Sequence, residues 1–240
     1  MPRTNYIRFS PAAQRLFFPR KGQVLSHGPR IGSTTFFTPQ MTLTDHETFL
    51  AYTLSFRKQE AFTAWVAYDY VLLLKPFDPT NSGKDTLARG TEHDWKAFGF
   101  EFTSRPQSNF TWGFSTRYGG YYADGKRLNL TADVGYRIQP YLSFSMSASY
   151  NDIRLPAPWN RTEFWLVGPR IDITFTNTLF FTAFLQFNEQ LNNINLNTRF
   201  QWRYRPASDL FIVYTDNYFA NPLMVRNRAL VLKLNYWWNP

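Results

Sequence analysis

The chain has 240 residues, no cysteine, 26 Lys and Arg against 17 Asp and Glu, and a mean hydropathy of −0.39, yet 19% of its residues are aromatic. The lack of cysteine excludes a disulfide framework and a cysteine-ligated metal, the aromatic content argues against disorder, and apolar runs such as residues 71–74 are far shorter than the about 20 residues of a membrane-spanning helix. The formal net charge of +9 leaves nucleic acid or an anionic membrane surface to be weighed as partners.

The N-terminal region, residues 1–28, shows no clear period. Ile7–Phe9 and Leu16–Phe18 are interpreted either as an extra hairpin or as part of an irregular lead-in, ahead of a domain that covers residues 29–240. Residues 1–5 lead into mixed sequence without the apolar core of a signal peptide. The chain is therefore expected to be either cytoplasmic or a piece of a longer protein.

From residue 29 onward, apolar and polar residues alternate, as in strands whose two faces meet different surroundings. In the clearest segment, residues 194–205, Leu196, Phe200 and Trp202 alternate with asparagine, glutamine and arginine. The pattern predicts twelve strands, at residues 29–38, 46–57, 60–74, 93–105, 108–119, 126–138, 140–151, 161–175, 178–189, 193–205, 208–216 and 228–238.

The predicted strands are about twice as long as the five or six residues usual in globular proteins. A strand of about twelve residues, tilted by about 40°, spans roughly 30 Å, which is the thickness of the hydrocarbon core of a bilayer. The predicted connections also alternate in length, with short ones at residues 57–60, 105–108, 139–140, 176–178 and 205–208 and long ones at 75–91, 119–125, 152–160 and 217–227. Together these features predict an all-β, antiparallel, up-and-down transmembrane β-barrel of about twelve strands, complete in itself or part of a larger barrel.

The alternation assigns the side chains of such a barrel to two surfaces. Charged residues on the polar face are predicted to line a wet lumen: Asp69, Glu101, Arg117, Asp133, Arg137, Arg170, Asp172, Arg199, Arg203 and Lys233. Aromatic residues near the strand ends are predicted to form girdles at the headgroup level: Tyr118, Tyr136, Trp202, Tyr204, Tyr236 and Trp238. In the alternative of a soluble β-sandwich, the same rings would be core residues and the same charges would face solvent.

Several segments resemble the C-terminal barrel region of an uncharacterised family of Gram-negative outer-membrane proteins. They are Pro76–Asp78, Tyr118–Gly120, Tyr150–Asp152, Phe184–Asn188 and, most specifically, Arg199–Tyr214, in which Ala207 stands where the family usually has glycine. The resemblance covers about two thirds of the chain. It implies a longer protein with a carbohydrate-binding-like module of the xylanase type before the barrel, and it supplies no catalytic residues. The final segment, 229–238, resembles the signal read by the barrel-assembly machinery, although two residues follow it.

Few residues suggest chemistry. His46 and His93 have acidic neighbours in sequence, but adjacent residues of a strand point to opposite faces, so no metal site is predicted. An outer-membrane enzyme acting on lipid acyl chains would need a serine near a histidine, and His93 with Ser104 or Ser115 is the alternative that remains open. Nucleic acid is not expected as a partner, because the arginines and the aromatic rings alternate across the strands and could not engage the same base.

The sequence therefore predicts a non-enzymatic protein of the Gram-negative outer membrane, without cofactor, that serves as an anchor, a pore or a conduit linked to surface glycan handling. Its expected partners are outer-membrane lipid, a glycan or small solute, and the barrel-assembly machinery during insertion. Basic residues at the strand ends, such as Lys126, Arg154 and Arg161, are either solvated or in contact with anionic lipid phosphates.

Overall fold

The computed structural model describes residues 5–83 and 85–238, and within these ranges all regular structure is β-strand. No helix of the length and apolarity needed to cross a membrane occurs in the described part of the chain. Its fourteen strands are β1 (Ile7–Phe9), β2 (Ala12–Gln14), β3 (Val24–Phe37), β4 (Leu43–Phe56), β5 (Ala61–Leu72), β6 (Glu92–Thr103), β7 (Phe110–Tyr121), β8 (Gly125–Ile138), β9 (Leu142–Arg154), β10 (Arg161–Thr176), β11 (Leu179–Asn188), β12 (Asn193–Arg205), β13 (Ser208–Phe219) and β14 (Met224–Leu234).

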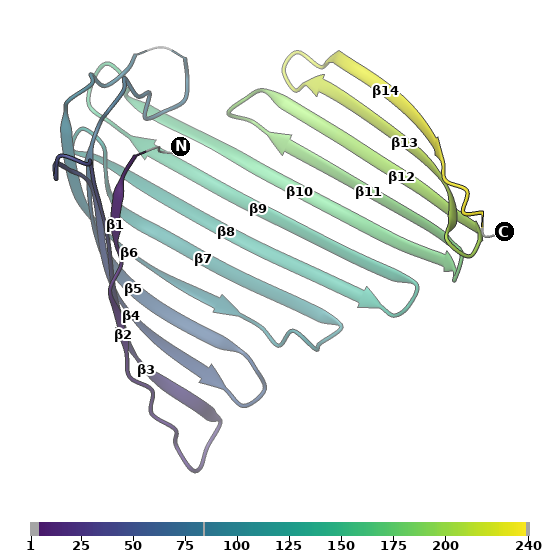
Figure 1. Ribbon diagram of the computed structural model, residues 1–240, viewed down its shortest axis with the longest axis horizontal. Helices are drawn as coiled ribbons and strands as arrows, with labels where there is room; N and C mark the ends of the chain where they lie inside the picture. The colour runs from purple at the N-terminus through teal and green to yellow at the C-terminus, as the bar shows by residue number, and fades with distance from the viewer. Residues whose placement is uncertain (1–4, 84, 239–240) are drawn as a thin grey trace. The chain divides into compact units, whose positions relative to one another are not determined.

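The strands form one antiparallel, up-and-down sheet in which sequence neighbours are also neighbours in space (Figure 1). The order runs from β1 through β3 and onward to β14, and β2 also pairs with β3. Within residues 5–83 and 85–238 no pairing joins β14 to β1, β2 or β3, so the sheet is open. This arrangement differs from a sandwich, whose strands are divided between two sheets.

The N-terminal region is not the hairpin that the sequence suggested as one alternative. β1, β2 and the bridge between Phe17 and His27 all pair with β3, and their register continues without a shift. They thus form one interrupted strand, residues 7–17, which we call the N-terminal row. Proline explains the interruption, because it has no N–H to donate: the pair of Pro11 with Ser33 and the pair of Arg15 with Pro29 each show only the hydrogen bond that the non-proline N–H donates.

The twelve long strands, β3–β14, correspond to the twelve predicted from the alternation, and they are 10 to 16 residues long. The largest differences lie at the ends of the chain, where β3 already begins at Val24 inside the predicted lead-in and β14 ends at Leu234. The connections predicted to be short are confirmed, at residues 57–60, 104–109, 139–141, 177–178 and 206–207, whereas three of the four predicted to be long are short. Residues 119–125 contract to a tight turn at 122–124, and only the connection 73–91 is long, because strand pairing extends through residues that the sequence had assigned to loops.

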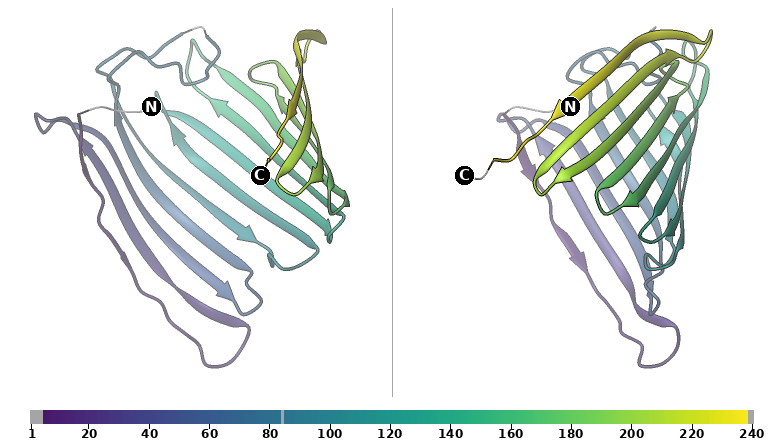
Figure 2. Two further views of the ribbon diagram at one scale, coloured as in Figure 1. Left: turned by 45° about the vertical axis from the view of Figure 1, so that its right-hand side comes forward. Right: turned by 90° about the vertical axis from the view of Figure 1, so that its right-hand side faces the viewer.

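The chain divides into two compact units. Unit 1 consists of Met1–Pro106, Gly113–Thr131 and Tyr150–Glu163, and unit 2 of Gln107–Trp112, Ala132–Ser149 and Phe164–Pro240. Besides Ala51 on β4 and Ala97 on β6, the buried apolar side chains of unit 1 belong to the 73–91 loop and to the end of β9 with the residue that follows it: Leu73, Leu87, Ile153 and Leu155. In unit 2, β14 is exposed along its whole length, and Figure 2 shows it in yellow beside β13.

Candidate functional site

The strand register sorts the side chains of unit 1 onto two faces. Leu50, Val66, Phe98 and Tyr118 follow one another across β4, β5, β6 and β7 as directly paired residues. They are 50%, 53%, 52% and 42% exposed, respectively. Soluble monomers rarely expose a continuous apolar surface of this kind. We call the side of the sheet that carries this row the apolar face of unit 1.

The opposite side, the polar face of unit 1, brings predicted lumen residues together. Asp69 on β5 and Arg117 on β7 form an ion pair of 3.7 Å across the intervening strand β6. Trp95 of β6 is directly opposite Asp69, but the diagonal from Asp69 to Arg117 passes over two small residues of β6, Ala97 opposite Ala67 and Gly99 opposite Arg117. Glu101 lies on the same face, paired with Ser115.

A second arginine, which is not among the predicted lumen residues, extends this polar cluster. Arg127 on β8 donates from Nη2 to Asn151 Oδ1 at 3.0 Å, and its guanidinium stacks over the Tyr121 ring with 5.4 Å to the centroid. Tyr121 in turn donates to the Pro79 carbonyl at 3.2 Å, so the 73–91 loop lies over this end of the polar face. Arg117 Nη1 and Arg127 Nε are buried and find no hydrogen-bond acceptor among the described residues.

The 73–91 loop has its own polar centre at Asp78. The Asp78 carboxylate accepts from Thr80 Oγ1 at 2.7 Å, from the Thr80 N–H at 2.8 Å and from the Gly83 N–H at 2.8 Å. Partial burial alone would raise the pKa of Asp78, but these hydrogen bonds outweigh it and lower the pKa below its ordinary value of 3.8. The loop is therefore ordered by an ionised carboxylate at neutral pH.

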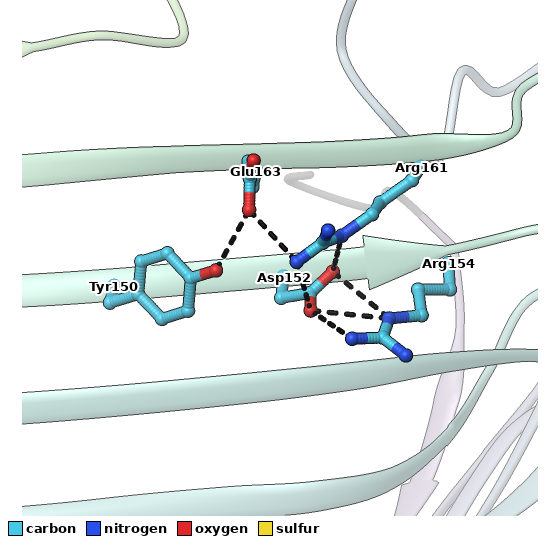
Figure 3. Close-up of polar contacts among 5 residues, drawn as sticks. All are labelled: Tyr150, Asp152, Arg154, Arg161 and Glu163. Atoms are coloured by element: carbon cyan, nitrogen blue, oxygen red, sulfur yellow. Dashed lines mark hydrogen bonds and ion pairs between the residues drawn. The ribbon is translucent and has the colours of Figure 1, made fainter.

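On the apolar face of unit 1, the strand ends next to the 155–160 turn carry a charged network (Figure 3). Asp152 is 5% exposed and accepts hydrogen bonds from two guanidinium groups, with 2.8 Å from Arg154 Nη2 and 3.1 Å from Arg161 Nε. Arg161 also bonds Glu163 at 2.9 Å, and Glu163 accepts from the Tyr150 hydroxyl at 2.9 Å. Arg154 and Arg161 were predicted as basic residues near the strand ends, but Asp152 was placed in the connection 152–160, and its role as their shared partner was not predicted.

Unit 2 shows the same separation of two faces. On its polar face, Arg170 bonds Asp172 at 2.8 Å, and Asp172 accepts from Thr182 Oγ1 at 2.8 Å. The register then places Arg199 opposite Thr182, Arg203 opposite Asp209 and Lys233 opposite Phe211, all on this face. Five of the predicted lumen residues thus share one side of the sheet of unit 2: Arg170, Asp172, Arg199, Arg203 and Lys233.

The remaining predicted lumen residues, Asp133 and Arg137, lie on β8 within unit 2. They share a side of the strand by parity. Asp133 is exposed, and Arg137 donates from Nη2 to the Ser108 carbonyl at 3.0 Å.

The apolar face of unit 2 carries exposed leucines along β14: Leu230, Leu232 and Leu234 pair with Tyr214, Ile212 and Leu210 of β13. One charged group interrupts this face. Asp216 is 1% exposed and is enclosed by the Tyr214 and Tyr218 hydroxyls, which donate to it, and by Arg228, whose Nε lies 2.9 Å away. Asp152 and Asp216, the two buried acids on the apolar faces, are thus both covered by phenol or guanidinium groups from neighbouring positions.

Most of the predicted girdle residues are exposed rings: Tyr118, Tyr136, Trp202, Tyr236 and Trp238. Tyr204 is half-buried, donates to the Asn235 carbonyl at 2.9 Å and packs edge-on against Trp202. Tyr236 and Trp238 follow the end of β14 and do not belong to a strand. Their arrangement into girdles stays a prediction.

The structure does not bring together the serines and the histidine of the enzyme alternative. Ser115 pairs with Glu101, which places it about 26 Å along β6 from His93 at about 3.3 Å per residue. Ser104 directly follows the last residue of β6 and is therefore still further from His93. His93 instead bonds Thr91 Oγ1 and accepts from the Ala123 N–H, and His46 is held by Thr35 and Thr48.

Within residues 5–83 and 85–238, no three His, Asp or Glu side chains are grouped so that they could hold a metal ion. No protein-family model, curated protein or solved structure matches the chain.

Proposed function

We propose that the chain is an integral β-barrel of the Gram-negative outer membrane, without enzymatic activity. In this proposal the apolar faces of both units contact lipid, and the polar faces line a wet lumen. The protein then acts as an anchor, a pore or a conduit for a small solute or glycan. The barrel-assembly machinery would insert it.

The observation that carries this proposal is the row Leu50–Val66–Phe98–Tyr118. Four paired side chains on four neighbouring strands, each at least 42% exposed, form an apolar surface that none of the described residues covers. Strands of 10 to 16 residues carry such surfaces, and tilted strands of this length match a bilayer. A soluble sandwich would bury the apolar side against a second sheet.

The polar faces support a wet lumen, because they carry charged side chains that form ion pairs with one another. An apolar core would not hold such charges. The Asp69–Arg117 and Arg170–Asp172 pairs each lie on a face whose other side is apolar. A link to glycan handling rests on the sequence resemblance alone. The separation of His93 from Ser104 and Ser115 removes the structural argument for an acyl-chain enzyme built on these residues.

Heat-modifiable migration on a gel tests the proposal. Folded outer-membrane barrels resist detergent at room temperature and unfold on boiling, so the chain extracted in mild detergent is expected to show two bands that convert into one. Circular dichroism of the unboiled sample is expected to show β-structure. A protein that is monodisperse in buffer without detergent would refute the proposal.

A further inference from the structure

We propose that Arg154 and Arg161, held on the shared carboxylate of Asp152, form a binding site for the phosphate group of a membrane lipid, at the end of the apolar face of unit 1. This inference rests on the proposed function, since it needs a membrane beside that face.

The neighbouring strands place the site on the apolar face. Asn151 turns toward the polar face, where Arg127 and Asn129 donate to it at 3.0 and 3.1 Å. Adjacent residues of a strand point to opposite sides, so Tyr150 and Asp152 lie on the apolar face. Arg154 follows with the same parity, and it is within electrostatic reach of Tyr118, the last member of the exposed apolar row.

Asp152 fixes both guanidinium groups. Arg154 binds it through Nε and Nη2, at 3.2 and 2.8 Å from Oδ2, and Arg161 binds it through Nε and Nη2, both at 3.1 Å. The two Arg side chains remain 64% and 52% exposed, whereas Asp152 itself is 5% exposed. Each guanidinium thus directs its Nε and Nη2 edge at the carboxylate, and neither Nη1 group has a partner among the described residues.

The charge balance favours an anion at this surface. Lys126 is exposed on the same side of the sheet, because a Cβ at its neighbour Gly125 would meet Leu155 and the Arg154 carbonyl on the other side. Three cations therefore face two carboxylates, Asp152 and Glu163, and the first of these is covered. Guanidinium groups bind phosphate oxygens with paired, charge-assisted hydrogen bonds, and a fixed guanidinium loses little entropy in doing so.

The apolar surroundings favour a lipid as the source of the phosphate. A groove of about 460 Å³ runs along the same face, lined by side chains that include Leu50, Tyr52, Val66, Phe98 and Phe100. The groove lies on β3–β6, and β7 and β8 separate it from the arginines, so a lipid bound by its headgroup at β9 would extend its acyl chains across the apolar face toward the groove. A free phosphate ion has no acyl chain to contact these apolar side chains. A lipid phosphate is therefore expected to bind more tightly than inorganic phosphate.

The test is native mass spectrometry of the detergent-solubilised chain titrated with dioleoyl phosphatidic acid, with dioleoylglycerol as the phosphate-free lipid and with inorganic phosphate. The wild-type protein is expected to bind phosphatidic acid and to bind dioleoylglycerol and inorganic phosphate at least about tenfold more weakly, a difference of about 1.4 kcal/mol. The double variant Arg154→Gln, Arg161→Gln is expected to lose about tenfold in affinity for phosphatidic acid. Inorganic phosphate that bound as tightly as phosphatidic acid would overturn the lipid assignment.

A matched control and a second variant keep the result interpretable. Arg57→Gln, Arg105→Gln removes the same charge from hydrogen-bonded, exposed arginines next to the turns that follow β4 and β6, and it is expected to bind phosphatidic acid as the wild type does. If the first double variant fails to fold because Asp152 is left unpaired, the triple variant Asp152→Asn, Arg154→Gln, Arg161→Gln removes that charge as well and is expected to show the same loss.

The failures of the site and of the barrel can be told apart. A detergent-dependent, heat-modifiable protein whose arginine variants bind phosphatidic acid as tightly as the wild type does would overturn the site and keep the barrel. A protein that is monodisperse without detergent would overturn the barrel. The lipid site, which needs a membrane beside the apolar face, would be overturned with it.

Discussion

A charge placed at Val66 discriminates between lipid and water on the apolar face of unit 1. Val66 lies five residues from the start of β5, which spans Ala61–Leu72. At about 3.3 Å per residue and a tilt of about 40°, this corresponds to a depth of about 13 Å, the middle of an apolar band about 25 Å tall. At that depth an arginine on the lipid side costs about 2–4 kcal/mol. On a solvated face the same change stays within about 0.5 kcal/mol, because Val66 is already 53% exposed.

The assay is reversible urea unfolding of Val66→Arg in lipid vesicles, followed by the fluorescence of the eight tryptophans. We expect the free energy of unfolding to fall by about 2–4 kcal/mol. Ser115→Arg is the control, because Ser115 lies on the polar face opposite Glu101 and a new arginine there gains an ion-pair partner. A loss of less than about 0.5 kcal/mol at Val66, or an equal loss at both positions, would refute the assignment of the two faces.

Three further predictions concern packing, pH and catalysis. A Cβ at Gly99 would lie 2.0 Å from the Thr116 carbonyl oxygen and 2.6 Å from Trp65 Cζ2. Gly99→Ala should therefore lower the free energy of unfolding, measured by urea titration, by about 1–3 kcal/mol. An unchanged urea midpoint would contradict this packing. Because the pKa of Asp78 is lowered in the folded state, its contribution to stability is fully present above its ordinary pKa of 3.8 and is lost as pH falls through the folded value. Limited proteolysis of the 73–91 loop should then increase on acidification in the wild type but not in Asp78→Asn, and identical pH profiles would argue against this role. His93→Ala should leave the hydrolysis of a long-chain nitrophenyl ester at the wild-type level. Hydrolysis by the wild type that is lost in this variant would instead support the alternative of an enzyme acting on acyl chains.

The long strands could be predicted from the sequence because alternation is a local property. Residues 194–205 show it directly, and β12 extends over Asn193–Arg205. The connections could not be predicted in the same way. Residues 119–125 contain glycine and tyrosine and suggest a loop, but Tyr121 and Gly125 belong to strands, because pairing with neighbouring strands decides where a strand ends.

The networks of the site depend on contacts between strands, which the sequence does not display. Asp69 and Arg117 are predicted to share a face by parity alone, but their ion pair depends on the small residues of β6 between them. Asp152 was not predicted as a site residue, because the sequence placed it in the connection 152–160, and its ion pair with Arg161 of the next strand is visible only in the structure. The N-terminal row was missed for a similar reason. Proline interrupts the alternation of its sequence, and only its pairing with β3 shows that β1 and β2 continue one register.

The N-terminal row also changes the conditions under which the sheet could close. It occupies the edge of β3, so the free edges among the described strands are the row itself and β14. Successive strands are joined by short turns or antiparallel ladders and reverse direction each time, so the row and β14 both run opposite to β3 and therefore parallel to each other. A closed barrel in which all neighbouring strands are antiparallel thus requires one of two changes. Either one more strand lies between these two edges, or the N-terminal row separates from β3. If the row left β3, the exposed edge of β3 would include Pro29, which has no N–H. A β14 strand paired with that edge would therefore lack one backbone hydrogen bond at Pro29.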